Sequence, residues 1–368
     1  MSTTTLSPRR IIDCDVHCNH SIESPDGLDP YIPETFRTAM ELFMATRPSH
    51  GYRNPAGQVH RSDCDYRSAE GFERDHLDRY GITFAVMQPQ PTMDYGLIHN
   101  ADIGTMLCSA GNDWQVDHYL NRSERYLGSI CVNMSDPAGA VREIERLGDH
   151  PQMVQILAPG EALLLYGHRF YHPVYEACER KGLVFALHPG SEGSFRSSTP
   201  VGRPSSYFEW HTSLPQTFMA HTGSLVAEGV FEKFPGLKVL LTEGGYGWLA
   251  PLMWRMDKNF KALRATVPWL RELPSTYIRR QVRLTTQPVE EPANPVHAMQ
   301  MMEMIDAENT LCFSSDYPHW DFDDPFRAFP SRTPEALMER ILWGNAYELY
   351  EKKLAPLMKA RETEGAAR

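Results

Sequence analysis

Strand-like apolar segments, each followed by a helix-like segment, recur eight times along this chain. The strand candidates cover residues 10–18, 82–89, 126–134, 153–159, 182–189, 237–243, 281–287 and 309–316. Several of them are near-continuous runs of Val, Ile and Leu, which are typical of parallel strands buried on both faces. The segments between them carry helix signals, such as Asp-Pro at the start of 136–149, a closing Gly in 171–182 and Pro-Gly at the end of 218–236.

Eight such units over 368 residues predict the α/β class and, within it, a (β/α)₈ TIM barrel. A doubly wound open sheet is the alternative. We expect one barrel domain over residues 11–352, a disordered tail over residues 1–10 and a charged C-terminal tail over residues 353–368.

The composition is that of a globular protein, with 42% apolar and 23% charged residues and no run of 18 apolar residues. The formal net charge of −11 repels phosphate backbones, so we expect neither a nucleic-acid nor a membrane partner. The N-terminus lacks an apolar signal-peptide core, which favours a cytoplasmic location. Seven scattered cysteines without a CxxC pair indicate reduced thiols.

Two segments are longer than ordinary barrel connections. Residues 46–75 follow the first predicted strand as a long insertion, and residues 189–212 follow the fifth as a lid-like loop. In a barrel, both would lie over the C-terminal ends of the strands, where active sites are built.

The first predicted strand carries three ionisable side chains. Asp13, Asp15 and His17 alternate with other residues, so a strand period of two places all three on one face. In a barrel that face is the interior, where such groups are costly unless a cation compensates them. The alternative is a solvated polar loop at the N-terminus.

Further polar residues end later strands. His188 ends the fifth, Glu243 the sixth and Asp316 the eighth. Taken singly, these residues could be a core histidine or helix N-caps. Taken together, Asp15, His17, His188 and Asp316 predict one divalent metal, with Zn²⁺ favoured and Mn²⁺ or Fe²⁺ as alternatives.

At these residues the sequence resembles the metal-dependent amidohydrolase superfamily. It is most similar to the amidohydrolase-related (amidohydrolase 2) branch that includes aminocarboxymuconate-semialdehyde decarboxylase and hydroxybenzoate decarboxylases. The resemblance rests on IIDCDVHCNH, HLDRYGITFAVM, YGHRFYHPVYEAC, LHPG, FSSDYPHWDFDDP and GNAYELY. It implies a barrel with one divalent metal held by Asp15, His17, His188 and Asp316, with Asp13 behind these ligands. It also implies a homodimer or a higher homo-oligomer.

One position departs from the pattern of the family's decarboxylases. They resemble each other in a histidine at the end of strand six, where this chain has Glu243. A carboxylate does not reproduce the proton donation of an imidazole near pH 7. His211 and His319 are therefore further acid/base candidates, beside Asp316 and Glu243.

Two reactions fit such a site. The first is hydrolysis, in which a metal-activated water cleaves an amide, lactam or related C–N or C–O bond of a small cyclic or aromatic substrate. The alternative is non-oxidative decarboxylation of an aromatic or enoic acid, and a non-catalytic binding protein is a remote third. The candidate substrate-binding residues are Trp210, Trp248, Trp320, Arg61 and Arg196, with Arg53 as a further arginine in the long loops.

Overall fold

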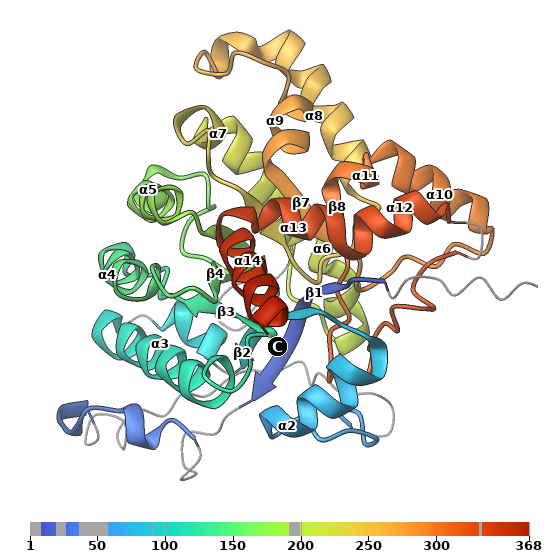
Figure 1. Ribbon diagram of the computed structural model, residues 1–368. Helices are drawn as coiled ribbons and strands as arrows, with labels where there is room; N and C mark the ends of the chain where they lie inside the picture. The colour runs from blue at the N-terminus through green and yellow to red at the C-terminus, as the bar shows by residue number, and fades with distance from the viewer. Residues whose placement is uncertain are drawn as a thin grey trace, which may run out of the picture.

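The computed structural model describes residues 9–19, 27–36, 58–90, 92–98, 100–190, 199, 201–330 and 333–367. Within these ranges, eight strands form one sheet in sequence order, and each strand is parallel to the next (Figure 1). The strands are β1 (Ile12–Asn19), β2 (Phe84–Gln90), β3 (Tyr126–Cys131), β4 (Met153–Pro159), β5 (Val184–His188), β6 (Val239–Leu241), β7 (Val282–Thr285) and β8 (Leu311–Cys312). Each lies within or next to a segment that the sequence predicts as a strand.

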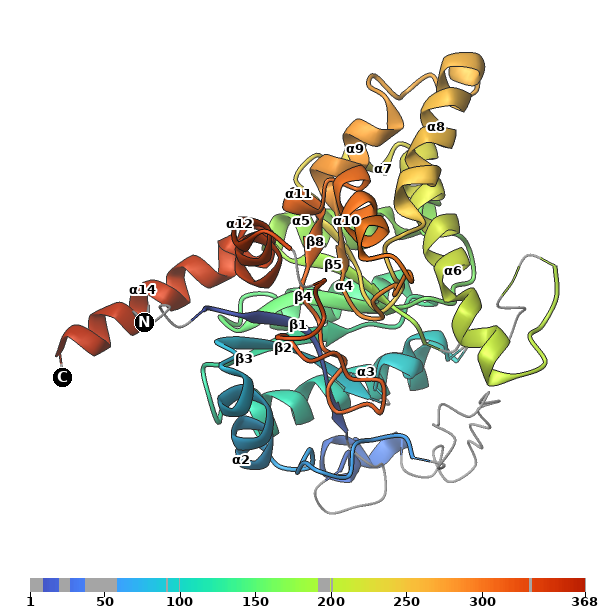
Figure 2. The ribbon, with the colours of Figure 1, turned by 90° about the vertical axis from the view of Figure 1, so that its right-hand side faces the viewer.

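Helices connect the strands and surround the sheet (Figures 1 and 2). The α-helices are α2 (Ala69–Phe72), α3 (Ala101–Gln115), α4 (Pro137–Leu147), α5 (His172–Lys181), α6 (Tyr207–Ala227), α7 (Val230–Lys233), α8 (Leu249–Leu263), α9 (Pro274–Gln281), α10 (Pro295–Met304), α11 (Ala307–Thr310), α12 (Glu335–Glu339), α13 (Asn345–Leu349) and α14 (Glu351–Ala367). Short 3₁₀ or π-helical segments are η1 (Asp29–Tyr31), η2 (Glu73–Asp78), η3 (Thr92–Leu97), η4 (Val116–Leu120), η5 (Arg169–Tyr171), η6 (Arg264–Thr266) and η7 (Arg340–Gly344).

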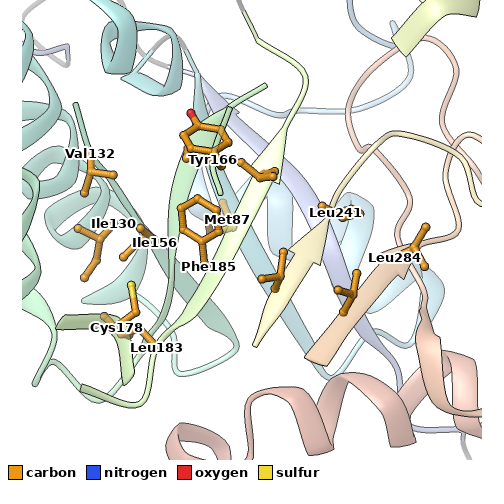
Figure 3. Packing of buried hydrophobic residues seen from close by; sticks show 14 of the residues in the cluster. Met87, Ile130, Val132, Ile156, Tyr166, Cys178, Leu183, Phe185, Leu241 and Leu284 are labelled. Atoms are coloured by element: carbon orange, nitrogen blue, oxygen red, sulfur yellow. The ribbon is translucent and has the colours of Figure 1, made fainter. Parts of the chain in front are cut away.

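Buried apolar side chains form two clusters, one on each face of the sheet. The outer cluster lies between strands and helices, and Figure 3 shows some of its members, among them Met87, Ile156 and Leu241. The inner cluster includes Ile12 and Val86. Two buried faces explain why the strands are nearly continuous apolar runs.

The N-terminal end of the barrel is closed by the last helices. Tyr350 and Leu354 belong to the inner cluster, and the Tyr350 hydroxyl donates a hydrogen bond of 2.7 Å to Gln155 Oε1. Leu354 lies in the segment predicted as a charged tail, which is helical as part of α14 and runs outward from this end (Figure 2). The physical reason is that its first turn packs on the barrel. Residues 1–8 of the predicted N-terminal tail lie outside the described ranges.

Strand β1 contains a β-bulge. Asp13 pairs with Ala85 and Val16 pairs with Met87, so residues 14 and 15 together oppose a single residue of β2. Ile12 and Cys14 belong to the inner cluster, whereas Val16 and Cys18 belong to the outer cluster. The bulge therefore reverses the face of the sheet on which the even-numbered residues lie. The prediction that Asp13 shares a face with Asp15 and His17 is therefore wrong, because strict alternation does not cross a bulge.

Asp13 instead joins β1 to the segment after β8. Its carboxylate accepts hydrogen bonds from the Ser315 amide (2.9 Å) and hydroxyl (2.5 Å), and His76 Nε2 of η2 lies 2.8 Å from it. The backbone amide of His17 also donates to the Tyr317 carbonyl at 2.7 Å. These contacts connect the first strand with the last. The prediction of a barrel is therefore confirmed. In the alternative, a doubly wound open sheet, the strands would not follow one another in sequence order, because the order changes direction within the sheet.

We expect Asp13→Ala to lower the free energy of unfolding by about 2–5 kcal/mol, because it strips buried donors on Ser315 and His76 of their partner. Urea unfolding followed by circular dichroism measures this change. Glu335→Ala is the control, because it breaks an ion pair with Arg9 in which both side chains are partly exposed, and it should cost less than about 1 kcal/mol. Equal losses in the two variants would show that the Asp13 contacts do not hold the barrel closed.

Candidate metal centre

Five of the polar residues predicted from the sequence lie close together at the C-terminal ends of the strands. Asp15 and His17 follow the bulge in β1, and His188 is the last residue of β5. Glu243 lies two residues after β6, and Asp316 follows β8. All five side chains are buried.

The side chains meet through short distances between nitrogen and oxygen atoms. His17 Nε2 lies 3.3 Å from Asp15 Oδ1 and 2.9 Å from Asp316 Oδ1. His188 Nε2 lies 3.6 Å from Asp15 Oδ1 and 3.0 Å from Glu243 Oε2. Ligand atoms of Asp15, His17, His188 and Glu243 all lie within 4.8 Å of one another, and His17, Asp316 and His319 form a second such group.

Two of these residues have a left-handed backbone. Glu243 has φ 58° and Asp316 has φ 59°, a conformation that costs a residue with a side chain about 1–3 kcal/mol. Hydrogen bonds hold both residues there, since the Glu243 amide donates to Thr285 Oγ1 at 3.1 Å and the Asp316 amide donates to the Asp15 carbonyl at 3.1 Å. Strain of this kind at two neighbouring polar residues indicates a functional site.

Several buried polar atoms at this centre make no hydrogen bond within the described part of the chain. They are both carboxylate oxygens of Asp15, both ring nitrogens of His17, and His188 Nε2. His188 Nδ1 lies 2.7 Å from the Pro189 carbonyl, which can only accept, so this nitrogen carries the proton and donates it. In the neutral ring, Nε2 then carries the lone pair and faces two carboxylates. A divalent cation bound by nitrogen and oxygen atoms fits this arrangement.

The charges at the centre are dominated by carboxylates. Burial lowers the pKa of His188, but Asp15 and Glu243 outweigh burial and raise it well above its ordinary value. Burial, followed by the neighbouring Asp316 carboxylate, raises the pKa of Glu243 to about 7. Burial and His319 lower the pKa of His17 to about 4, so this ring is a neutral donor of a lone pair.

Asp316 is held by groups on its outer side. His319 Nδ1 lies 2.6 Å from Asp316 Oδ1, and Gln287 Nε2 donates to Oδ2 at 3.4 Å. His319 Nε2 lies 3.3 Å from Gln90 Oε1. The structure thus brings the predicted acid/base candidate His319 to the centre. Gln90 and Gln287 were missed, because a neutral amide at or just beyond the end of a strand carries no distinctive pattern.

His211, the other histidine candidate, lies in α6 and not in a loop. Its Nε2 is 3.6 Å from Asp321 Oδ2, and its ring stacks on Tyr207 at 5.4 Å. Burial raises the pKa of Tyr207, and the Asp321 and Glu243 carboxylates raise it further. Tyr207 and Asp321 were missed, although one lies in the predicted lid-like loop and the other in the FSSDYPHWD motif.

The predicted aromatic residues differ in position. The Trp248 indole donates to the Gly244 and Gly245 carbonyls, both at 3.0 Å, so it folds back on its own loop. Trp210 lies in α6 with its ring 5.6 Å from Tyr207. The backbone amide of Trp320 donates to the Val59 carbonyl at 3.1 Å.

Of the predicted arginines, only Arg61 lies in the described part of the chain, and it does not reach the centre. Arg61 pairs with Asp63 at 2.8 Å and lies over the Phe322 ring. It lines a cavity of about 620 Å³ whose wall contains none of the five residues of the centre. Arg196 and Arg53 lie outside the described residues. Asp13, predicted behind the ligands, acts through the backbone, since its Oδ1 accepts from the Asp15 amide at 3.3 Å.

Comparison with known proteins places these findings in a family. A family model described as amidohydrolase matches residues 12–352. A gamma-resorcylate decarboxylase from Polaromonas sp. is 27% identical over 262 residues, which cover 65% of this chain and 74% of that protein.

Solved structures show the same fold. A dihydroxybenzoic acid decarboxylase from Polaromonas sp., with bound manganese and the inhibitor 2-nitroresorcinol, has a TM-score of 0.67 and 20% identity, covering 93% of this chain and 97% of its own. A 5-carboxyvanillate decarboxylase from Novosphingobium aromaticivorans, complexed with manganese and 4-hydroxy-3-methoxy-5-nitrobenzoic acid, has a TM-score of 0.68 and 17% identity, covering 93% and 96%.

We expect Mn²⁺ binding to the metal-free protein to release protons at pH 7. The raised pKa keeps His188 protonated, and its Nε2 must lose that proton to bind a metal. Apparent affinity should therefore rise with pH until the pH exceeds this raised pKa. Calorimetric titration in two buffers of different ionisation enthalpy measures the protons released.

The variant His172→Ala is the control, because this half-buried histidine contacts Lys233 outside the centre. It should release the same number of protons as the unmodified protein. Binding heats that do not depend on the buffer would contradict the role of His188.

Proposed function

The chain belongs to the amidohydrolase family, and from that premise we propose that it is a divalent-metal-dependent decarboxylase acting on a hydroxylated aromatic acid. The observation that carries the proposal is the buried cradle of Asp15, His17 and His188 with Asp316 beside it. The relatives support it, since those described above are named as decarboxylases of aromatic acids. Hydrolysis, the first expectation from the sequence, is the alternative to this proposal.

Asp15, His17 and His188 would hold the metal, with Asp316 at its side. When bound, the metal supplies positive charge that holds the carboxylate and an adjacent hydroxyl of the substrate. The sequence alone favours Zn²⁺. The two neighbouring structures contain manganese, and together with the mixed carboxylate and imidazole donors this favours Mn²⁺. The metal's positive charge would also offset the carboxylates, which otherwise repel an anionic substrate.

The chemical step needs a proton at the ring carbon that bears the carboxylate. Asp316, once protonated through His319, gives this proton to the ring carbon; the bond from the ring to the carboxylate then breaks, and its electron pair restores the aromatic ring as CO₂ leaves. His319, 2.6 Å from Asp316 Oδ1, resupplies the proton from solvent. One proton is consumed and one CO₂ is released, so the reaction balances.

The aromatic side chains of α6 would receive the flat substrate. Tyr207, Trp210 and His211 have ring centroids 5.4–6.2 Å apart and lie in the segment predicted to cover the mouth. Such surfaces suit aromatic rings.

None of the helices in the described ranges is both long and apolar enough to cross a bilayer. Homo-oligomerisation and a cytoplasmic location stay predictions.

We expect the Mn²⁺-loaded protein to release CO₂ from one or more members of a panel of dihydroxybenzoates and carboxylated methoxyphenols. Coupled CO₂ detection and chromatography of the phenol product measure this reaction. A chelator should abolish it, and added Mn²⁺ should restore it. Cleavage of amides, lactams or lactones without CO₂ release would favour hydrolysis instead.

We expect Asp316→Asn to lower kcat by about 10²–10⁴-fold, because the amide cannot deliver the proton to the ring carbon. Steady-state kinetics on the substrate identified in the panel measure the loss. Asp324→Asn is the matched control, since this carboxylate lies in the same segment and caps the Phe326 amide. Equal activity of the two variants would show that Asp316 is not the proton donor.

A further inference from the structure

We propose that Glu243 is itself a metal ligand and completes the protein part of the cradle, while Asp316 stands beside the metal as the acid. The family resemblance implies a histidine at this strand end and names Asp316 as the fourth ligand. The inference rests on the metal dependence proposed above. It concerns this chain's own residue at the position where it departs from its relatives.

Distances between the ligand atoms support the assignment. Bonds of 2.0–2.2 Å to a metal put neighbouring ligand atoms about 3.0 Å apart in octahedral and about 3.4 Å apart in tetrahedral geometry. His188 Nε2 lies 3.0 Å from Glu243 Oε2 and 3.6 Å from Asp15 Oδ1. Asp15 Oδ1 lies 3.3 Å from His17 Nε2. These three neighbouring pairs therefore already have the spacing of ligands around one ion, and all four residues offer ligand atoms within 4.8 Å of one another.

The position of the ring proton of His188 also supports Glu243 as a metal ligand. Nδ1 donates to the Pro189 carbonyl, so in the neutral ring Nε2 is an acceptor. It lies 3.0 Å from Glu243 Oε2, which is also an acceptor. Two acceptors that face each other this closely, both buried, repel unless a proton or a metal ion lies between them. A metal bound to both atoms removes the repulsion and leaves the proton on Nδ1.

Asp316 is placed differently from Glu243. Its Oδ1 lies 2.9 Å from His17 Nε2 but is also engaged by His319, and its Oδ2 is engaged by Gln287, so it belongs to the second group of candidate ligands. Glu243 belongs to the first group, with Asp15, His17 and His188. The left-handed backbone of Glu243, fixed by Thr285, holds its carboxylate at the barrel mouth. The two acids thus divide between binding the metal and carrying the proton.

A second carboxylate ligand changes which metal the site prefers. Two carboxylates and two imidazoles balance the charge of a divalent ion, and oxygen donors favour Mn²⁺ over softer ions. One carboxylate with imidazoles is closer to the sets that hold Zn²⁺. With Asp316 assigned to the proton, Glu243 keeps the number of carboxylate ligands at two, a set that suits Mn²⁺.

The test measures Mn²⁺ dissociation constants of the full chain by electron paramagnetic resonance of free Mn²⁺. We expect Glu243→Gln to weaken binding by at least about 10–100-fold, whereas Asp316→Asn should weaken it less. Asp323→Asn is the control, because this half-buried carboxylate binds the Val289 amide outside the centre and should bind Mn²⁺ as the unmodified protein does. Thermal unfolding of the metal-free variants checks that each is folded.

Glu243→His supplies a second measurement, because it restores a ligand-competent side chain with less negative charge. We expect it to regain tight Zn²⁺ binding but to keep weakened Mn²⁺ binding. The inference is overturned if Glu243→Gln binds Mn²⁺ as tightly as the unmodified protein, or if Asp316→Asn loses more affinity than Glu243→Gln. Failure of the proposed function looks different, since the unmodified protein would then bind no metal or release no CO₂.

Discussion

Three carboxylates, Asp15, Glu243 and Asp316, converge with two imidazoles at the buried mouth of the barrel. Negative charge at this density is unfavourable in a poorly hydrated environment unless a cation balances it. The rest of the centre depends on this constraint. The strained turns bring the acids inward, and the amide and carbonyl partners around them hold each side chain in one orientation. The fold thus contributes a fixed arrangement of donors into which an ion fits.

This rigidity comes from contacts outside the ring of donors. Asp13 joins β1 to the segment after β8, and the Pro189 carbonyl sets the tautomer of His188. Gln287 and His319 hold Asp316 from the outer side. Partners of this kind matter because a ligand that rotates loses affinity even when its identity is unchanged. Hydrolysis and decarboxylation both use the same set of metal ligands, so the reaction is set by groups other than these ligands.

Much of this arrangement could be predicted from the sequence, because the signals are strong and local. Apolar runs located all eight strands, and polar residues at their ends located Asp15, His17, His188, Glu243 and Asp316. The bulge at residues 14 and 15 was not visible, because an inserted residue in a buried strand leaves the composition unchanged. The helical position of His211 and the burial of Leu354 were also missed, because they depend on contacts with distant parts of the chain. Gln90 and Gln287 have no charge to mark them.

The closure between β1 and the segment after β8 joins residues 302 positions apart, from Asp13 to Ser315. A chain leaving the ribosome grows at about 5–20 residues per second, so its first strand waits roughly 15–60 s for this partner. The donors on β1 are made at the start of translation, whereas Asp316 is among the last parts to emerge. The centre can therefore assemble only when synthesis is nearly complete. A product terminated before β8 would lack Asp316 and the contacts that close the barrel, so the complete centre forms only on a chain that extends past residue 316.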